Sequence, residues 1–220
     1  MIPVIICSHN RTKLVKQSIE SLKENSDHEL QIIVVDDSNN GETHEYLKTV
    51  DGITYYHVNG PTTIGVSWLI GAAMAKPSEF IYFATEDIYY LPLWDKYVVG
   101  ALEQYDDLVL VGGYGVHGGG EARPVFDRDV RYAGLQAGFG IMMRRKDWVE
   151  WGYFPNDDED SWIGYQSRAT GKKIGVIDPP VIVHTGYTST HPVNSKITDI
   201  PHDRKRVEDN QIEYPEVYFE

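Results

Sequence analysis

The chain has 220 residues, which is long enough for one sizeable hydrophobic core or for one domain with an appendage. Hydrophobic residues make up 41% of it and charged residues 24%, as is ordinary for a globular protein, and no apolar run is long enough to span a membrane. The net charge of −13 disfavours broad contact with nucleic acid or anionic lipid. It leaves room for a small basic pocket that binds a phosphorylated ligand.

The chain opens with a short apolar run, MIPVIIC. This run is too short for a signal peptide and lacks a basic leader, so we expect it to form a core strand. The single cysteine, Cys7, excludes an internal disulfide and fits a reducing compartment, so we expect a cytoplasmic protein.

In the first half of the chain, apolar strands alternate with helical patterns. Strands are predicted at residues 2–7, 30–35, 53–58 and 79–84, and helices at residues 11–24, 42–49, 65–76 and 93–105. Such alternation is typical of a parallel sheet with helices on both faces, so the sequence predicts an α/β fold.

The second half is less regular. A glycine-rich segment at 113–124 is predicted to be a loop, and the polar stretch after residue 186 an irregular tail or an arm. We predict a strand at 108–113, before the loop. Between the loop and the tail we predict strands at 136–144 and twice within 173–184, and helices at 146–151 and from the acidic loop to about Gly171.

Two adjacent acids, Glu86 and Asp87, follow the apolar strand at 79–84. Carboxylates placed there lie at the edge where open α/β sheets bind ligands. An acid pair is costly to desolvate unless it meets a cation, and a divalent ion carrying phosphate oxygens is a natural partner. The alternative interpretation is an acidic, solvated turn.

The first two strands end in polar residues that should meet at the same edge. Ser8 and His9 end the first strand, and Asp36 and Asp37 end the second. His9 offers a flat face for a base, and Asp37 can accept a hydrogen bond from an imide or a ribose hydroxyl. Alternatively, Ser8 and Asn10 cap the next helix, and residues 36–40 turn the chain.

Two further candidates lie in the second half. One carboxylate of the run at 156–160 can serve as a general base toward a sugar hydroxyl, although acids in a first helical turn also complement the helix dipole. His184 ends an apolar strand, where a neutral imidazole can ligate a metal or serve the structure alone.

Taken together, five segments resemble the family 2-like glycosyltransferases of the GT-A fold. They are PVIICSHNRTKLVKQSIESL, LQIIVVDDSNNGET, YFATEDIYYLP, GFGIMMRRKDW with WGYFPNDDEDSW, and VIVHTG, and the resemblance covers roughly residues 1–186. It implies a single GT-A-type, Rossmann-like domain with a mixed, mostly parallel sheet. Residues 1–105 would form the nucleotide-sugar-binding half, 106–186 the acceptor and catalytic half, and 187–220 a C-terminal tail or arm.

The resemblance also implies roles for the residues at the strand ends. His9 and Asp37 would contact the base, usually uracil, with Ser8 and Asp36 in support. Asp87 and His184 would hold a divalent cation, Mn²⁺ or Mg²⁺. Two more donor-side residues complete the set, namely Glu86 near the ribose or sugar and Arg168 at a common basic position.

The implied reaction is a single displacement that inverts the anomeric carbon. Asp160 would deprotonate the acceptor hydroxyl, with Glu159 or Asp158 as the alternative base, and Trp162 would lie near the acceptor. The sequence departs from the family pattern at Thr85, which replaces the first acid of the metal motif. It also departs at residues 67–68, where Ser-Trp stands in place of Arg-Asn.

We therefore expect a metal-dependent transferase that moves a sugar from a nucleotide-sugar donor to a hydroxyl of a glycan, lipid-linked or protein acceptor. Among nucleotide sugars, a UDP-sugar is the favoured donor. A nucleotidyltransferase would share the nucleotide site and the metal motif, but CSHNRTK lacks the glycine-rich phosphate loop of that class. A catalytically degenerate sugar-nucleotide or glycan-binding module is the non-enzymatic alternative, suggested by the incomplete metal motif.

Overall fold

A computed structural model describes residues 1–113, 120–133, 140–152 and 159–185 of the chain. The strands are β1 (Ile2–Ser8), β2 (Leu30–Asp36), β3 (Ile53–His57), β4 (Phe80–Thr85), β5 (Ile88–Tyr90), β6 (Leu108–Gly112), β7 (Ala122–Val125), β8 (Arg128–Ala133), β9 (Gly140–Arg144), β10 (Lys173–Asp178) and β11 (Ile182–His184). The helices are α1 (Thr12–Asn25), α2 (Gly41–Thr49), α3 (Ile64–Met74), α4 (Trp94–Gln104), α5 (Arg145–Trp151) and α6 (Glu159–Thr170). The predicted tail at 187–220 lies outside the described residues.

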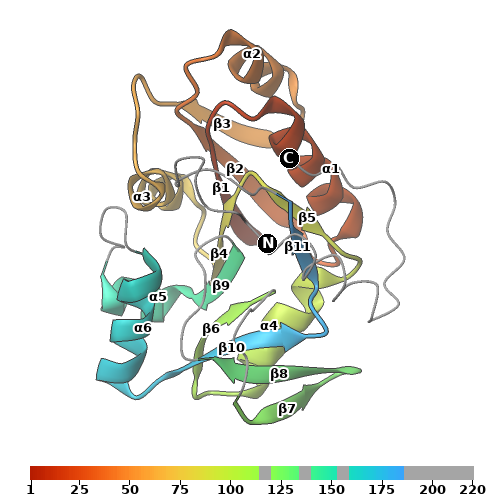
Figure 1. Ribbon diagram of the computed structural model, residues 1–220, viewed down its shortest axis with the longest axis vertical. Helices are drawn as coiled ribbons and strands as arrows, with labels where there is room; N and C mark the ends of the chain where they lie inside the picture. The colour runs from red at the N-terminus through yellow and green to blue at the C-terminus, as the bar shows by residue number, and fades with distance from the viewer. Residues whose placement is uncertain (114–119, 134–139, 153–158, 186–220) are drawn as a thin grey trace, which may run out of the picture.

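Nine strands form one sheet in the order β3-β2-β1-β4-β9-β6-β10-β8-β7, which runs from the top to the bottom of Figure 1. The pairs β3–β2, β2–β1, β1–β4 and β6–β10 are parallel. The pairs β4–β9, β9–β6, β10–β8 and β8–β7 are antiparallel. The prediction of an α/β fold with a mixed sheet is confirmed; the sheet is partly rather than mostly parallel, and its parallel part is concentrated in the N-terminal half.

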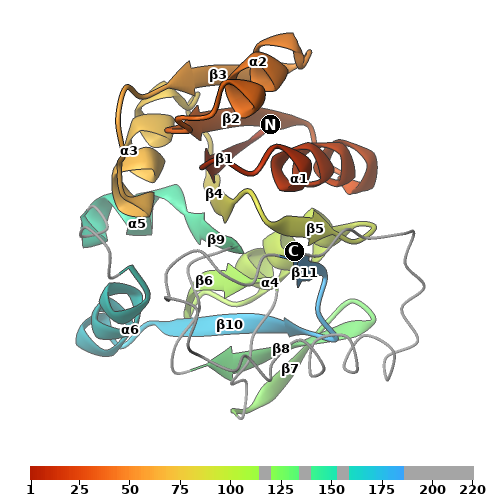
Figure 2. The same ribbon diagram turned by 45° about the horizontal axis from the view of Figure 1, so that its top comes forward.

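Helices cover both faces of the sheet, and strand alternation decides which residues each face receives. One core cluster joins alternate residues of β1 and β2 to α1, α2 and α4, while the other joins the remaining residues to α3, α5 and α6. Figures 1 and 2 show α1 and α3 on opposite sides of β1 and β2. Because both faces are covered, β1 is buried along its whole length, as its uninterrupted apolar sequence predicts.

Helix α3 contains a glycine that the helical pattern alone does not explain. A Cβ atom on Gly71 would lie 2.3 Å from the Cγ2 atom of Ile5 on β1. The missing side chain therefore lets the helix pack directly on the sheet, which offsets the low helix propensity of glycine.

The hairpin β7–β8 was not predicted, and the predicted loop at 113–124 overlaps its first strand. Pairing with β8 gives these residues the backbone hydrogen bonds that their composition does not suggest. Pro124 is tolerated because β7 is the last strand of the sheet, where a missing N–H is not needed by a neighbour.

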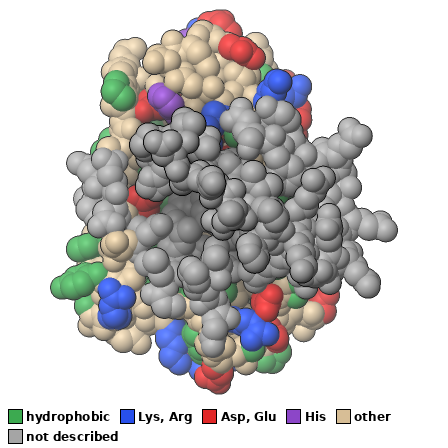
Figure 3. Space-filling view, in the orientation of Figure 1, with side chains coloured by type: hydrophobic (Ala, Val, Ile, Leu, Met, Phe, Trp, Pro, Cys, Tyr) green, Lys and Arg blue, Asp and Glu red, His purple; other side chains and the backbone are tan. Residues whose placement is uncertain are grey.

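A second, small sheet pairs β11 with β5 in antiparallel orientation, with His184 opposite Ile88. This pairing brings the end of the described chain back to the residues that follow β4. Within the described part of the chain, the helices are too short or too polar to cross a membrane. Figure 3 shows Lys or Arg and Asp or Glu side chains next to one another at the lower end of the face that it displays.

Candidate functional site

The carboxyl ends of four strands are aligned by their pairing register. Cys7 of β1 pairs with Thr85 of β4, Ser8 of β1 pairs with Asp36 of β2, and Asp36 pairs with His57 of β3. The residues that follow these positions therefore leave the sheet at one edge, as the sequence predicts.

A pocket of about 300 Å³ opens at this edge. We call it the edge pocket, and its lining consists of Cys7, Ser8, His9, Arg11, Asp37, Pro61, Thr62, Thr63, Ile64, Ser67, Thr85, Glu86 and Asp87. The predicted donor-binding residues Ser8, His9, Asp37, Glu86 and Asp87 are thus brought together. The hydroxyl of Ser8 is buried there without a hydrogen-bond partner among the described residues.

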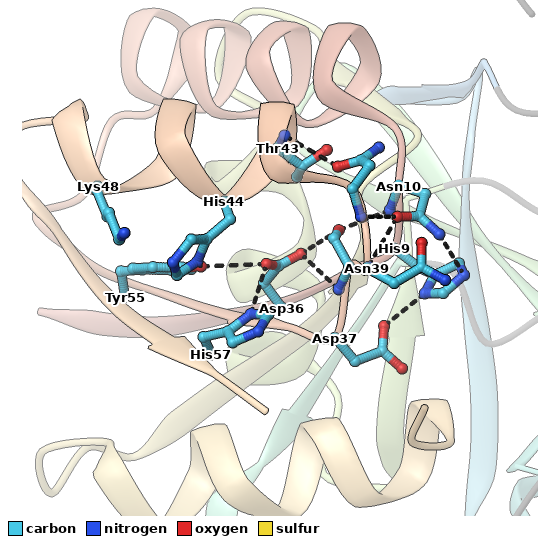
Figure 4. Close-up of polar contacts among 12 residues, drawn as sticks. His9, Asn10, Asp36, Asp37, Asn39, Thr43, His44, Lys48, Tyr55 and His57 are labelled. Carbon is cyan, nitrogen blue, oxygen red and sulfur yellow. Dashed lines mark hydrogen bonds and ion pairs between the residues drawn. The ribbon is translucent and has the colours of Figure 1, made fainter. Parts of the chain in front are cut away.

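His9 and Asp37 form one wall of the edge pocket, and Asn10 fixes the tautomer of the histidine (Figure 4). The Asn10 Oδ1 atom accepts hydrogen bonds of 3.0 Å from the backbone N–H groups of Asn39 and Asn40, so its amide nitrogen faces outward. That nitrogen lies 2.9 Å from His9 Nε2, which must then accept. The proton is on Nδ1, which donates to Asp37 Oδ1 at 2.8 Å.

The second oxygen of Asp37 is also held. Its Oδ2 atom accepts a hydrogen bond of 2.7 Å from the backbone N–H of Thr62, in the loop before α3. The carboxylate is nearly buried, whereas the side chain of His9 is 54% exposed. The carboxylate is therefore fixed in position, and the imidazole presents a free face to a ligand.

Asp36 turns the other way and does not line the pocket. Its carboxylate is fully buried and accepts hydrogen bonds from Ser38, Tyr55 and His57 (Figure 4). Successive residues of a strand face opposite sides, so the adjacent pair Asp36-Asp37 is divided between two surroundings. The supporting role predicted for Asp36 can therefore act only through the backbone of the turn.

Asp87 is the most connected carboxylate of the edge pocket. Its Oδ2 atom lies 2.9 Å from Arg11 Nη1 and 3.3 Å from His184 Nε2, and its Oδ1 atom accepts from the Thr85 hydroxyl at 2.5 Å. Burial acts to raise the pKa of Asp87, but the hydrogen bonds from His184 and Thr85 and the charge of Arg11 outweigh it and lower that pKa. Asp87 is thus a carboxylate at neutral pH.

Glu86 is in the opposite situation. Burial, together with the negative charge of Asp87, raises the pKa of Glu86 to about 8. The nearest guanidinium nitrogen, Arg11 Nε, is 3.8 Å away, too far for a hydrogen bond. Two adjacent carboxyl groups are therefore set apart by their surroundings, with Asp87 charged and Glu86 mostly protonated below pH 8.

Arg11 is the functional candidate that the sequence interpretation missed. It was assigned only to the start of the first predicted helix, yet its side chain reaches across to the acids after β4. A basic residue three positions beyond the end of a strand was the available signal. Only the pairing of β1 with β4 shows that this arginine and Asp87 face each other.

The residues present fit a divalent cation at Asp87 and His184. A carboxylate oxygen and an imidazole nitrogen are suitable ligands for Mn²⁺, and a separation of 3.3 Å is close to the ~3 Å between neighbouring ligands in an octahedral site with metal–ligand distances near 2.1 Å. Arg11 contacts the same oxygen of Asp87, so a cation bound there would share or replace that contact.

The structure describes the candidate general bases at the start of α6 only in part. Glu159 begins the helix, and its charge is one of four that, with burial as the largest cause, raise the pKa of the Cys7 thiol. Glu159 is partly buried and is not among the residues that line the edge pocket. The side chain of Asp160 and all of Asp158 lie outside the described residues.

The remaining two candidates on α6 are described in full. Trp162 is partly buried, and its ring stacks on that of Tyr165 with the centroids 5.8 Å apart. Arg168 is exposed in the last turn of the helix, six residues beyond Trp162. It is not among the residues of the edge pocket, so the structure does not bring it to the other donor-side candidates.

The fold and the edge pocket define an α/β protein of the GT-A class. The model of the family described as "Glycosyl transferase family 2" matches residues 4–157, and the chain belongs to this family. A comparison with curated protein sequences finds no match.

Two solved structures show the same fold. GalNAc-T7 with UDP, GalNAc and Mn²⁺ superposes with a TM-score of 0.68 at 16% identity, covering 84% of this chain and 43% of that one. The mannosyltransferase PcManGT from Pyrobaculum calidifontis, in complex with GDP-Man and Mn²⁺, gives a TM-score of 0.57 at 15% identity, covering 80% of this chain and 56% of that one. The chain therefore spans about half the length of these structures, and the likeness is one of fold.

Proposed function

We propose that the protein transfers a sugar from a nucleotide-sugar donor to an acceptor hydroxyl, with inversion at the anomeric carbon. The observation that carries this proposal is the meeting of Asp37, Asp87 and His184, which come from the ends of β2, β4 and β11, at one edge of the sheet. Membership of glycosyl transferase family 2 supports it.

The base of the donor would bind at His9 and Asp37. A uracil N–H can donate to Asp37, whose two oxygens each have a lone pair left after the bonds from His9 and Thr62. The exposed face of the imidazole offers a stacking surface. A UDP-sugar is therefore the first donor to test.

The diphosphate would lie toward Asp87 and Arg11. A divalent ion, Mn²⁺ or Mg²⁺, held by Asp87 and His184 would supply positive charge for the departing diphosphate. Arg11 adds a guanidinium at the same place, and guanidinium groups bind phosphate through paired hydrogen bonds. Glu86, when protonated, can donate a hydrogen bond to a ribose or sugar oxygen.

The acceptor would approach from the side of α6, with Trp162 beside it. Asp160, in the first turn of this helix, is the proposed general base, and Glu159 is the alternative. A base in this role takes the proton of the acceptor hydroxyl while that oxygen attacks the anomeric carbon. The negative charge of Glu159 is among those that raise the pKa of Cys7, a residue of the pocket lining, and this supports a role for the acidic first turn.

The experiment is a donor screen followed by a comparison of variants. UDP-, GDP- and dTDP-sugars, each with and without Mn²⁺, are tested for a rise in melting temperature, and the best donor is used in a transfer assay that reports the anomeric configuration of the product. Asp160→Asn should slow transfer by about 10²- to 10⁴-fold with donor binding nearly unchanged. Glu159→Gln tests the alternative base, and Glu150→Gln, an exposed acid on α5, is the matched control.

Retention of the anomeric configuration would contradict the proposed mechanism. Wild-type turnover in Asp160→Asn together with loss in Glu159→Gln would transfer the role of base to Glu159. Release of pyrophosphate from a nucleoside triphosphate and a sugar phosphate would instead identify a nucleotidyltransferase.

The contact of Arg11 with Asp87 favours a second candidate, a module that binds sugar nucleotides without turnover. A guanidinium 2.9 Å from the carboxylate can neutralise it in place of a metal ion. In that case donor would bind equally well with and without Mn²⁺, and neither transfer nor donor hydrolysis would be seen. Hydrolysis of the donor in the presence of Mn²⁺ would exclude this candidate.

A further inference from the structure

A second cluster of ligand-type side chains lies outside the edge pocket, on the far side of Asp36. We call it the histidine cluster, and it consists of Asp36 at the end of β2, His44 on α2, and Tyr55 and His57 on β3 (Figure 4). One ligand atom from each of Asp36, His44 and His57 can be chosen so that all three lie within 4.8 Å of one another.

The distances in the histidine cluster are close to those of a metal centre. His57 Nδ1 is 3.1 Å from Asp36 Oδ2, and the two imidazole rings have their centroids 4.5 Å apart. Ligand atoms on a tetrahedral zinc ion, with bonds of 2.0–2.2 Å, are about 3.3 Å apart. The cluster therefore needs to contract by at most about 1.5 Å, and both histidines are only partly buried, so their side chains have room to rotate.

The set of atoms also suits zinc chemically. Two imidazole nitrogens and one carboxylate oxygen are ligands that Zn²⁺ takes in proteins, with the fourth position left for water. Asp36 is fully buried, while His57 is about one quarter exposed, so the cluster has a fixed inner ligand and an outer side that solvent reaches.

The surroundings orient the carboxylate as they do in known metal sites. Asp36 Oδ1 accepts hydrogen bonds from the backbone N–H of Ser38 at 3.2 Å and from its hydroxyl at 2.5 Å, which leaves Oδ2 to His57 and Tyr55. Such outer hydrogen bonds hold metal-binding carboxylates in position. The Tyr55 hydroxyl donates a hydrogen bond of 3.1 Å to Asp36 Oδ2 and lies 2.5 Å from His44 Nδ1, so it links the carboxylate to the second histidine.

We propose that Asp36, His44 and His57 bind one zinc ion, which ties the ends of β2 and β3 to helix α2. This site is separate from the cation site proposed at Asp87 and His184, and it does not rest on the proposed transferase function. Because Asp37 follows Asp36 directly, the zinc ion would hold the turn that forms one wall of the edge pocket.

The test uses the full chain, freed of metal by dialysis against a chelator, and zinc chloride as the only ligand. Competition with a chromophoric chelator measures the number of ions and their affinity. Wild-type protein should bind one ion at this site, and saturation to 100 times the dissociation constant should raise the melting temperature by about 5–10 °C. Substitution with Co²⁺ should give the intense visible absorption of a tetrahedral site.

Variants then locate the ion. His44→Gln and His57→Gln should each weaken zinc binding by about 100-fold or more, since each removes a nitrogen ligand. His28→Gln is the matched control, because His28 also bonds a buried aspartate, Asp95, at 2.9 Å but lies outside the histidine cluster. His184→Gln should leave this zinc site intact.

Two results would overturn the proposal. One is the failure of wild-type protein to bind zinc below about 100 μM, or a Co²⁺ spectrum without tetrahedral bands, and this result needs no variant that folds. The other is unchanged zinc affinity in both His44→Gln and His57→Gln, with loss in His184→Gln, which would place the ion at Asp87.

Discussion

The edge pocket and the histidine cluster lie back to back at the end of β2, and neighbouring residues, Asp37 and Asp36, form the carboxylate of each. Both carboxylates accept a hydrogen bond from a histidine Nδ1 atom, at 2.8 Å in the pocket and 3.1 Å in the cluster. They differ in what surrounds them. The pocket is open and contains an arginine, whereas the cluster surrounds a fully buried acid with histidine and tyrosine side chains.

Two neighbouring residues therefore have different roles: Asp37 borders a surface that can bind a ligand, whereas Asp36 holds neighbouring segments together. Asp37 is held at both oxygens yet borders open space, so a ligand can reach it. The oxygens of Asp36 accept hydrogen bonds that connect β2, β3 and the turn, so its removal should lower the free energy of unfolding. The predictions below test this division of roles.

The largest effect is expected for Asp87→Ala. The change removes the carboxylate that contacts both Arg11 and His184, so binding of donor and of Mn²⁺ should weaken together and transfer should fall by about 10³-fold. Calorimetric titration and initial rates measure this, with Asp106→Ala, a fully exposed aspartate, as the control. Unchanged affinity for both ligands would remove Asp87 from the site.

The next effect separates the two neighbouring aspartates. Asp36→Ala leaves the buried Ser38 and the partly buried Tyr55 and His57 without their acceptor, so it should lower the free energy of unfolding by about 3 kcal/mol and the melting temperature by about 6–12 °C. Asp37→Ala should cost only about 1 kcal/mol, since water can reach His9, but should weaken donor binding more. Equal effects of the two changes on both measurements would refute the division.

A smaller effect is expected at Asn10, which has a φ of 58° and fixes the tautomer of His9. Asn10→Ala should destabilise the protein by about 2 kcal/mol, because alanine is strained in this conformation and two backbone N–H groups lose their acceptor. Asn10→Gly removes the same hydrogen bonds without the strain, so it should be the milder change. Chemical denaturation of both variants measures the difference.

The smallest effect concerns Cys7, at the floor of the edge pocket. Burial, together with the carboxylates around it, raises the pKa of this thiol well above its ordinary value, so a thiol reagent should label the folded protein far more slowly than the unfolded chain at pH 8. Above about pH 8.5, the unfolded chain loses this proton and the folded protein keeps it. The contribution of Cys7 to stability should therefore decrease as the pH rises.

Rapid labelling of Cys7 in the native protein would show that the floor of the pocket is open. Addition of a UDP-sugar then tests whether the reagent reaches Cys7 through the edge pocket. Protection by the nucleotide sugar would mean that reagent and donor enter by the same route, since Cys7 lies beside Ser8 in the pocket lining.

The sequence was most informative where local pattern and tertiary structure agree. The apolar runs at β1, β2 and β4 are buried on both faces, and their polar ends meet at one edge because parallel strands point the same way. Ser8, His9, Asp37 and Asp87 could therefore be grouped in advance. His184 joins them through the antiparallel pairing of β11 with β5.

The sequence was least informative where partners come from distant segments. Arg11 looks like an ordinary residue at a helix start, and only the register of β1 against β4 places it on Asp87. The segment at 113–124 has a composition typical of a loop, yet its last residues belong to β7, which pairs with β8, and β8 pairs in turn with β10.

By itself, the sequence determined the α/β class, the order of strands and helices in the first half, and which carboxylates stand at strand ends, because these depend on hydrophobic period and chain direction. Tertiary structure alone decided that Asp36 and Asp37 face different surroundings and that His44 and His57 meet beside Asp36. It also decided that Asp87 is charged beside a mostly protonated Glu86. These outcomes depend on burial and on contacts between segments far apart in the chain, which no local pattern encodes.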